Sequence, residues 1–200
     1  MQQGTVEWHE ARLAKITASR FGEVLKKGTK GEMFGKVAWS YAYELVAEKL
    51  TGTWKEISAR PMEWGKANEP MARKMYMAET FDYVQEVGFV DYIDMIGCSP
   101  DGLIGDDGCL EIKCPWDSAN HVRALETKQV PEIYVPQVQG QLMCLDRKWC
   151  NFVSYDPRFK DISKRIIFIP VYRDEEYIKI LLNRLNEFKK IVKSILEKIK

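Results

Sequence analysis

The chain has 200 residues, of which 46% are hydrophobic and 30% charged, and its formal net charge is +1. This composition suits one soluble domain over residues 1–200 and excludes a disordered chain. No apolar run is long enough to span a bilayer and the first residues show no signal-peptide pattern, so we expect a cytoplasmic protein without a membrane partner. The near-neutral charge means that any DNA-binding surface must be a local concentration of basic residues.

The N-terminal third predicts helices. A short helix over Thr5 to Leu13 has Thr5 as N-cap and offers Trp8, Ala11 and Leu13 to the core, and a second helix starts at Thr17. A basic loop at Lys26 to Gly31 follows. From Met33 to Leu50, apolar residues recur at helical spacing and predict a core helix that ends at Gly52: Val37, Ala38, Tyr41, Ala42, Leu45 and Val46.

A further helix starts at Pro61 and extends toward Met77, with an interruption or kink expected at Pro70. The stretch from Phe81 to Ile96 turns to strand-like composition and leads into a hairpin, so we expect three antiparallel strands in this region.

The hairpin carries the chemistry. Asp106-Asp107-Gly108 is a turn signal between two apolar runs, and folding there brings Asp101 alongside Glu111. Because alternate strand residues share a face, Glu111 and Lys113 point one way while Leu110 and Ile112 fill the core. Two carboxylates suit Mg²⁺, or Mn²⁺ in its place, and the lysine can act on an attacking water, which is the chemistry of phosphodiester hydrolysis. A solvated Glu-x-Lys pair on an exposed strand is the ordinary alternative.

The chain then returns to helices and strands. Ser118 can cap a helix through Leu125, a second helix starts near Ile133, and two strands lie on either side of a turn at Asp156-Pro157-Arg158. A long amphipathic helix covers Glu175 to Ile199. Small buried core residues are the expected role of the cysteines, with a three-thiol cluster of the first three as the alternative: Cys98, Cys109, Cys114, Cys144 and Cys150.

Four stretches in this order resemble one nuclease family. They are Trp8-His9-Glu10-Ala11-Arg12-Leu13 with Ile16-Thr17-Ala18-Ser19, Trp64-Gly65-Lys66-Ala67-Asn68-Glu69, the hairpin, and Gln137-Val138-Gln139. The sequence resembles the bacteriophage lambda exonuclease family, or YqaJ-type viral recombinases. That resemblance implies an α/β fold with a restriction-endonuclease-like core, in which helices flank a central mixed β-sheet. Loops 26–32 and 125–133 do not match closely.

The resemblance also implies roles for single residues. Asp101, Glu111 and the backbone carbonyl of Ile112 would bind the metal, and Lys113 would act on the attacking water. Glu69 would support the metal site and Gln137 would position the nucleophile or the scissile phosphate. From the sequence alone, Glu69 could equally be a solvated helical residue and Gln137 a helix-start residue.

Recognition of the DNA end follows from the same resemblance. Arg12, Ser19 and Ser99 would bind a terminal 5′-phosphate, which suits the planar guanidinium and the hydroxyl donors. Met62, next to Arg60, would be the apolar wedge that splits the duplex. As alternatives, Arg12 could be a surface arginine, Ser19 a helix cap and Met62 a packing contact.

The implied activity is a Mg²⁺-dependent exonuclease that degrades one strand of linear double-stranded DNA from a 5′-phosphate end and leaves a 3′ single strand for phage recombination. The family implies a homotrimer, a single-strand annealing protein as partner, and a phage or prophage gene expressed in a bacterial host. An endonuclease of the same fold and a non-catalytic DNA-binding scaffold are the alternatives.

Overall fold

Two β-sheets form the centre of the protein. The computed structural model describes residues 1–55 and 59–199. The larger sheet has the order β2-β5-β6-β7-β8, formed by Val84–Gln85, Gly102–Ile104, Gly108–Lys113, Trp149–Tyr155 and Ile166–Tyr172. Strands β6 and β7 are parallel and the other neighbours antiparallel, so the sheet is mixed as expected. The smaller sheet has the order β1-β4-β3, formed by Ile16–Thr17, Ile96–Cys98 and Val90–Ile93.

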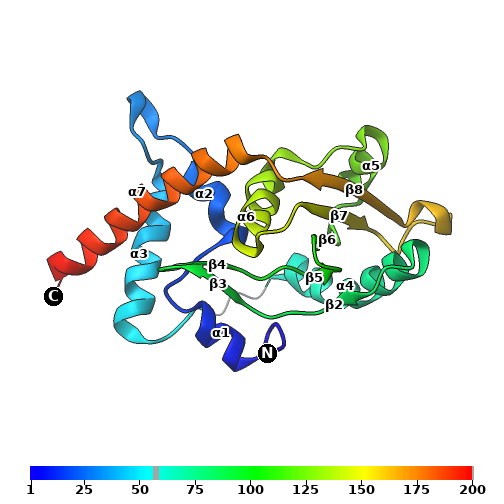
Figure 1. The fold of residues 1–200 in the computed structure, drawn as a ribbon, viewed down its shortest axis with the longest axis horizontal. Coiled ribbons are helices and arrows are strands. Elements are labelled where there is room, and N and C mark those ends of the chain that lie inside the picture. Colours follow the sequence, from blue (N-terminus) through cyan, green and yellow to red (C-terminus); the bar gives the residue numbers. More distant parts are fainter. Residues whose placement is uncertain (56–58, 200) are drawn as a thin grey trace.

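Helices cover both sheets. The α-helices are α1 Val6–Arg12, α2 Phe21–Leu25, α3 Lys36–Thr51, α4 Arg60–Thr80, α5 Ser118–Thr127, α6 Val135–Leu145 and α7 Glu175–Ile199. Short 3-10 turns lie at Ala18–Arg20, Thr29–Gly31, Glu132–Tyr134 and Ile162–Lys164. Helix α6 contacts β3 and β4 on one side and β7 on the other, and it lies between the two sheets in Figure 1. Each helix in the described part of the chain is too short or too polar to cross a membrane.

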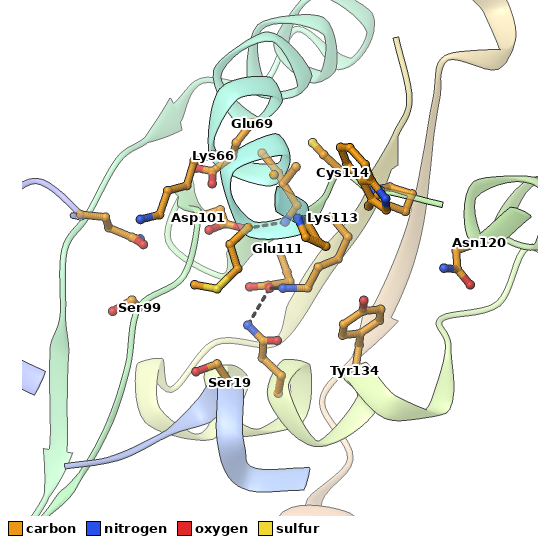
Figure 2. Close-up of a pocket in the computed structure, with 18 of the residues that line it drawn as sticks. Ser19, Lys66, Glu69, Ser99, Asp101, Glu111, Lys113, Cys114, Asn120 and Tyr134 are labelled. Atoms are coloured by element: carbon orange, nitrogen blue, oxygen red, sulfur yellow. Dashed lines mark hydrogen bonds and ion pairs between the residues drawn. The ribbon is translucent and has the colours of Figure 1, made fainter. Parts of the chain in front are cut away.

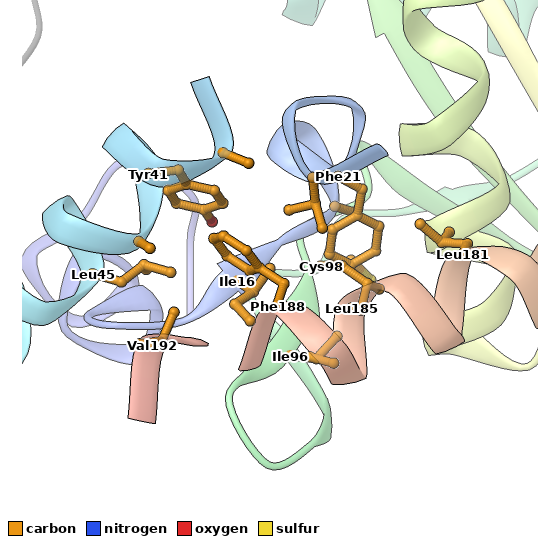
Figure 3. Close-up of a cluster of buried hydrophobic side chains, with 14 of the residues drawn as sticks. Ile16, Phe21, Tyr41, Leu45, Ile96, Cys98, Leu181, Leu185, Phe188 and Val192 are labelled. Atoms are coloured by element: carbon orange, nitrogen blue, oxygen red, sulfur yellow. The ribbon is translucent and has the colours of Figure 1, made fainter. Parts of the chain in front are cut away.

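The principal core lies where α2, α3 and α7 pack together. Figure 3 shows Phe188 of α7 beside Tyr41 and Leu45 of α3, with Phe21 of α2 next to Leu185. The ring centroids of Tyr41 and Phe188 are 5.6 Å apart. The apolar stripe predicted for the C-terminal helix is therefore the face that covers this core. A second core lies between α4 and the larger sheet and packs against the hairpin. It includes Ala72 and Tyr76 of α4 and Leu110 and Ile112 of β6.

Several sequence predictions were wrong in detail. Thr17 does not start the second helix: it ends strand β1 and pairs with Gly97, and α2 begins only at Phe21. Strands β3 and β4 do not join the hairpin in one antiparallel sheet, because β4 pairs with β1 in the smaller sheet. Helix α1 has no fully buried residue, so it lies on the core surface. Val37 is 45% exposed although its neighbour Ala38 is buried, since the helix turns Val37 outward. The N-cap of α5 is Asp117, which accepts from the Ala119 amide, and not Ser118.

Proline 70 is accommodated inside α4, which continues through it to Thr80. The turns at Asp106-Asp107-Gly108 and Asp156-Pro157-Arg158, the αL residue Gly52 and the Thr5 cap lie where they were expected. All five cysteines are free thiols, and Cys109 and Cys150 lie opposite each other on the paired strands β6 and β7. Within the described residues Cys98, Cys109 and Cys114 do not form a group that could hold a metal, so the three-thiol alternative is wrong.

Candidate active site

The hairpin places Asp101 at the point where its first strand begins. The Asp101 amide donates to the Leu110 carbonyl at 3.0 Å, and Gly102 pairs with Leu110. Beyond that pair, the amide of Ile112 donates to Oδ2 of Asp101 at 2.6 Å, so the carboxylate takes the place of the next strand residue. The Asp101 side chain is thereby fixed against β6, as the turn signal predicted.

The carbonyl of Ile112 faces the same side of β6. In an antiparallel ladder a residue directs its N–H and its C=O toward the same neighbouring strand. Because the Ile112 amide reaches Asp101, its carbonyl oxygen also lies on the Asp101 side, past the last β5 pair. Ile112 lines the pocket that contains Asp101 and Glu111. The Ile112 carbonyl oxygen and the Asp101 carboxylate therefore lie on the same side of β6.

Glu111 is the centre of the polar cluster. Its side chain is 1% exposed and its Oε1 accepts from Lys113 Nζ and, at 2.6 Å, from Gln137 Nε2 (Figure 2). Its Oε2 accepts from Gln141 Nε2 at 2.6 Å. Gln137 thus contacts the cluster that contains Glu111 and Lys113, as expected of a site residue. Gln141 was missed in the sequence, although its position four residues after Gln137 puts it on the same helix face.

Glu69 approaches from α4. It lines the same pocket, and its Oε1 accepts from Arg73 at 2.6 Å, one helical turn away. Arg73 also donates from Nε to the backbone carbonyl of Asp101 at 3.2 Å. One arginine therefore ties α4 to the hairpin and holds Glu69 beside the other two carboxylates.

The carboxylates of this cluster repel one another, and the repulsion shifts the pKa values of the groups in it. Desolvation and the charges of Glu111 and Glu69 raise the pKa of Asp101 well above its usual range. Desolvation raises the pKa of Glu69, and Glu111 adds to it, while Arg73 opposes both. For Lys113, desolvation works against the charged form, but Glu111 and Asp101 outweigh it and raise its pKa. Hard oxygen donors that repel one another fit a divalent cation, so Asp101, Glu111 and Ile112 suit Mg²⁺ or Mn²⁺.

The cluster forms one wall of a cavity of about 610 Å³. Arg12, Ser19 and Ser99 line the same cavity, as do Met62 and Lys66. Arg12 NH1 donates to Ser99 Oγ at 3.1 Å, and the Trp8 indole donates to the same oxygen at 3.0 Å. The guanidinium of Arg12 lies 4.1 Å from the centroid of the Trp8 ring. The residues that were expected to bind an end phosphate therefore lie beside those expected to bind the metal.

The remaining predicted residues lie at the cavity rim. Ser19 is exposed, and its hydroxyl is 3.3 Å from that of Thr17. Met62 lines the cavity and is 45% exposed, which leaves its thioether accessible. Arg60 begins α4 with an exposed side chain and is not one of the described residues that line the cavity, so its contact with DNA stays a prediction.

Comparisons with known proteins agree with this architecture. A family model described as the YqaJ-like viral recombinase domain matches residues 7–148, and the chain belongs to that family. The alkaline exonuclease LHK-Exo from Laribacter hongkongensis superposes with a TM-score of 0.89 at 38% sequence identity, over 98% of this chain and 96% of that one. Its complex with dAMP superposes with a TM-score of 0.90.

A more distant structure shows the fold alone. A phage-related exonuclease from Haemophilus somnus 129PT superposes with a TM-score of 0.75 at 15% identity, over 93% of this chain and 96% of that one. The search of curated proteins finds no match. The expected restriction-endonuclease-like nuclease fold is confirmed, with a five-strand mixed sheet flanked by helices.

Proposed function

We propose that this protein is a metal-dependent exonuclease that degrades one strand of linear double-stranded DNA from its 5′-phosphate end and leaves a 3′ single strand. One observation carries the proposal: the Asp101, Glu111 and Lys113 cluster shares a single cavity with the Arg12 and Ser99 pair. Membership of the YqaJ-like family and the 38% identity to an alkaline exonuclease support it.

The site has two parts with separate roles: the cluster of Asp101, Glu111 and Lys113, and a group of Arg12, Ser19 and Ser99 that we call the end pocket. Arg12 and the hydroxyls of Ser19 and Ser99 would bind the terminal phosphate, because a guanidinium and neutral donors complement a phosphate dianion. Lys113, held as an ammonium against Glu111, would orient the attacking water and stabilise negative charge at the scissile phosphate. Gln137, fixed on Glu111, would position the water or the phosphate. Glu69, held by Arg73, would support the metal-binding carboxylates.

Asp101, Glu111 and the carbonyl of Ile112 would hold Mg²⁺, with Mn²⁺ as a substitute. Such an ion supplies Lewis-acid activation of the phosphate and of the attacking water. The buried position of Glu111 and its three side-chain donors keep the ligand set rigid before the substrate arrives. A preformed donor set of this kind lowers the cost of ordering the site.

The complex of the relative LHK-Exo with dAMP is relevant to the reaction product that we propose. LHK-Exo binds dAMP, a deoxynucleoside monophosphate, and this supports release of mononucleotides by the present protein. Phage recombination, a homotrimer, a single-strand annealing partner and action in the bacterial cytoplasm remain expectations that follow from the family. A trimeric ring would retain DNA by linkage, which is compatible with a net charge of only +1.

The test uses linear and closed circular duplexes with 5′-phosphate or 5′-hydroxyl ends, in Mg²⁺ or EDTA. We expect mononucleotides from linear phosphorylated DNA in Mg²⁺ and no reaction in EDTA. The variants Asp101→Asn and Lys113→Ala should lose hydrolysis and keep the fold. Cutting of closed circles would contradict the exonuclease and favour an endonuclease of the same fold, and DNA binding without any hydrolysis would indicate a scaffold.

A further inference from the structure

A second cavity adjoins the candidate active site. It has a volume of about 440 Å³ and lies between α1, α3 and the start of α4. We call it the side pocket. Trp8, Arg12, Met62 and Lys66 line both cavities, so these four side chains form the boundary between them. The two cavities are therefore contiguous.

The side pocket is basic. Its described lining residues include five cationic side chains and one carboxylate, that of Glu48: Arg12, Lys15, Arg20, Lys55 and Lys66. Lys15 pairs with Asp91, and Arg20 pairs with Glu23 and Glu44. In the part of the chain that the structure describes, no carboxylate forms an ion pair with the other three. Because Arg12 is assigned above to the terminal phosphate, Lys55 and Lys66 are the two cations without a carboxylate ion pair among the described residues that the side pocket offers to a second anionic group.

Aromatic rings are interleaved with these cations. The rings of His9 and Trp54 stack at 5.0 Å with an angle of 5° between their planes. His9 meets Trp8 edge to face at 4.8 Å. Arg12 covers the Trp8 ring, and Arg20 lies 3.7 Å from the centroid of Tyr41. Tyr41 is buried, whereas Trp8 and Trp54 are half-buried, so these two tryptophans are the rings that a base could reach beside the cations of the pocket.

We propose that the side pocket binds unpaired nucleotides of the strand complementary to the one whose 5′ end occupies the active-site cavity. This inference rests on the proposed function and names a second DNA subsite within it. Proteins that bind single strands without sequence preference use this combination of a basic groove and stacking aromatics. Met62 and Arg12, at the boundary, would then separate the paths of the two strands.

The experiment measures binding without hydrolysis. Dye-labelled duplexes carry a 5′-phosphorylated end that is either blunt or recessed behind a 3′ overhang of about six nucleotides, a length within the range of single-strand subsites. Fluorescence anisotropy in EDTA gives Kd for both. We expect the overhang to tighten binding about tenfold in the unmodified protein, since stacking of one base supplies this much. Equal affinities would overturn the proposal.

Variants test whether the side pocket causes the overhang advantage, which is the ratio of Kd without the overhang to Kd with it. Trp54→Ala removes the stacking surface and Lys55→Glu reverses an exposed charge, so each should reduce the overhang advantage to near one. Lys55→Glu keeps the test valid if Trp54→Ala fails to fold. The matched controls are Trp39→Ala and Lys49→Glu on α3, which change an exposed tryptophan and lysine outside the side pocket and should keep the advantage.

Two more measurements distinguish a failure of the proposed function from a failure of the side-pocket proposal. Hydrolysis of the blunt phosphorylated duplex in Mg²⁺ by the unmodified protein tests the proposed function, whereas the overhang ratio tests the side pocket. Competition compares oligothymidine with polyglutamate at equal charge. Oligothymidine should displace the overhang substrate at lower concentration. If polyglutamate competes equally well, or if both variants keep the advantage, the pocket does not bind a nucleic acid strand.

Discussion

Replacing Asp156 by Asn should destabilise the protein in a pH-dependent manner. Asp156 is fully buried and accepts hydrogen bonds from Ser118 Oγ at 2.7 Å and from Arg158 Nε and NH2, both at 2.8 Å. The same arginine donates to the carbonyls of Trp116 and Pro115 at 2.9 and 3.0 Å. Asp156 therefore holds in place the segment that leads from Lys113 along the wall of the candidate active site.

The expected loss of unfolding free energy follows from the hydrogen bonds that Asn can still form at position 156. Its carbonyl oxygen can still accept from Arg158, and its amide can donate to the Ser118 hydroxyl. What disappears is the charge and one guanidinium hydrogen bond, so the free energy of unfolding at pH 7 should fall by about 2 kcal/mol. Burial alone would raise the pKa of Asp156, but hydrogen bonds from Arg158 and Ser118 outweigh it and lower the pKa.

The sign of the pH effect follows from that lowered pKa. The carboxylate contributes stability at pH values above its unfolded pKa of about 3.9, and the contribution is lost as pH falls through the lower folded value. Urea unfolding of both proteins between pH 7 and pH 3 should show a constant difference above about pH 5 that closes in acid. A difference that is absent at pH 7, or that stays unchanged at pH 3, would refute the reasoning.

Three other outcomes are expected. Arg12→Ala should abolish the preference for phosphorylated 5′ ends, measured as the ratio of degradation rates for 5′-phosphate and 5′-hydroxyl duplexes; an unchanged ratio counts against the end pocket. Phe188→Ala should lower the free energy of unfolding by about 3–5 kcal/mol in urea, because the ring is 1% exposed in the principal core; a loss below about 1 kcal/mol would mean that the core closes over the gap. EDTA should stop hydrolysis without changing the far-UV circular dichroism, and Mg²⁺ should restore it; activity that persists in EDTA would exclude the assigned ligands.

Local patterns were sufficient for the hairpin and for the long C-terminal helix. The turn at Asp106 to Gly108 and the alternation from Leu110 to Lys113 depend on neighbouring residues, and both appear in the structure. The same holds for the stripe on α7, whose period is set within each turn. The positions of Asp101, Glu111 and Lys113 relative to one another could therefore be predicted from a short stretch of chain.

Contacts between distant segments could not be predicted in this way. The parallel pair of β1 with β4 joins Ile16 to Ile96, and no local pattern indicates that partner. The hydrogen bond from Trp8 to Ser99 and the tie from Arg73 to the Asp101 carbonyl are equally remote in sequence. The resemblance supplied Arg12 and Ser99 as partners, whereas Gln141, the side pocket and the role of Arg73 emerged only from the folded arrangement.

Glu111 also restrains the motion of helix α6. Both amide donors from α6, Gln137 and Gln141, end on this one carboxylate, and α6 also packs against β3, β4 and α7. Glu111 on β6 thus links the larger sheet to α6, which also packs against strands β3 and β4 of the smaller sheet. Local opening of α6 would have to break both hydrogen bonds, so amide hydrogen exchange along the helix should be faster in a Glu111→Ala variant. The carboxylate that would bind the catalytic ion also sets how often that helix detaches from the hairpin.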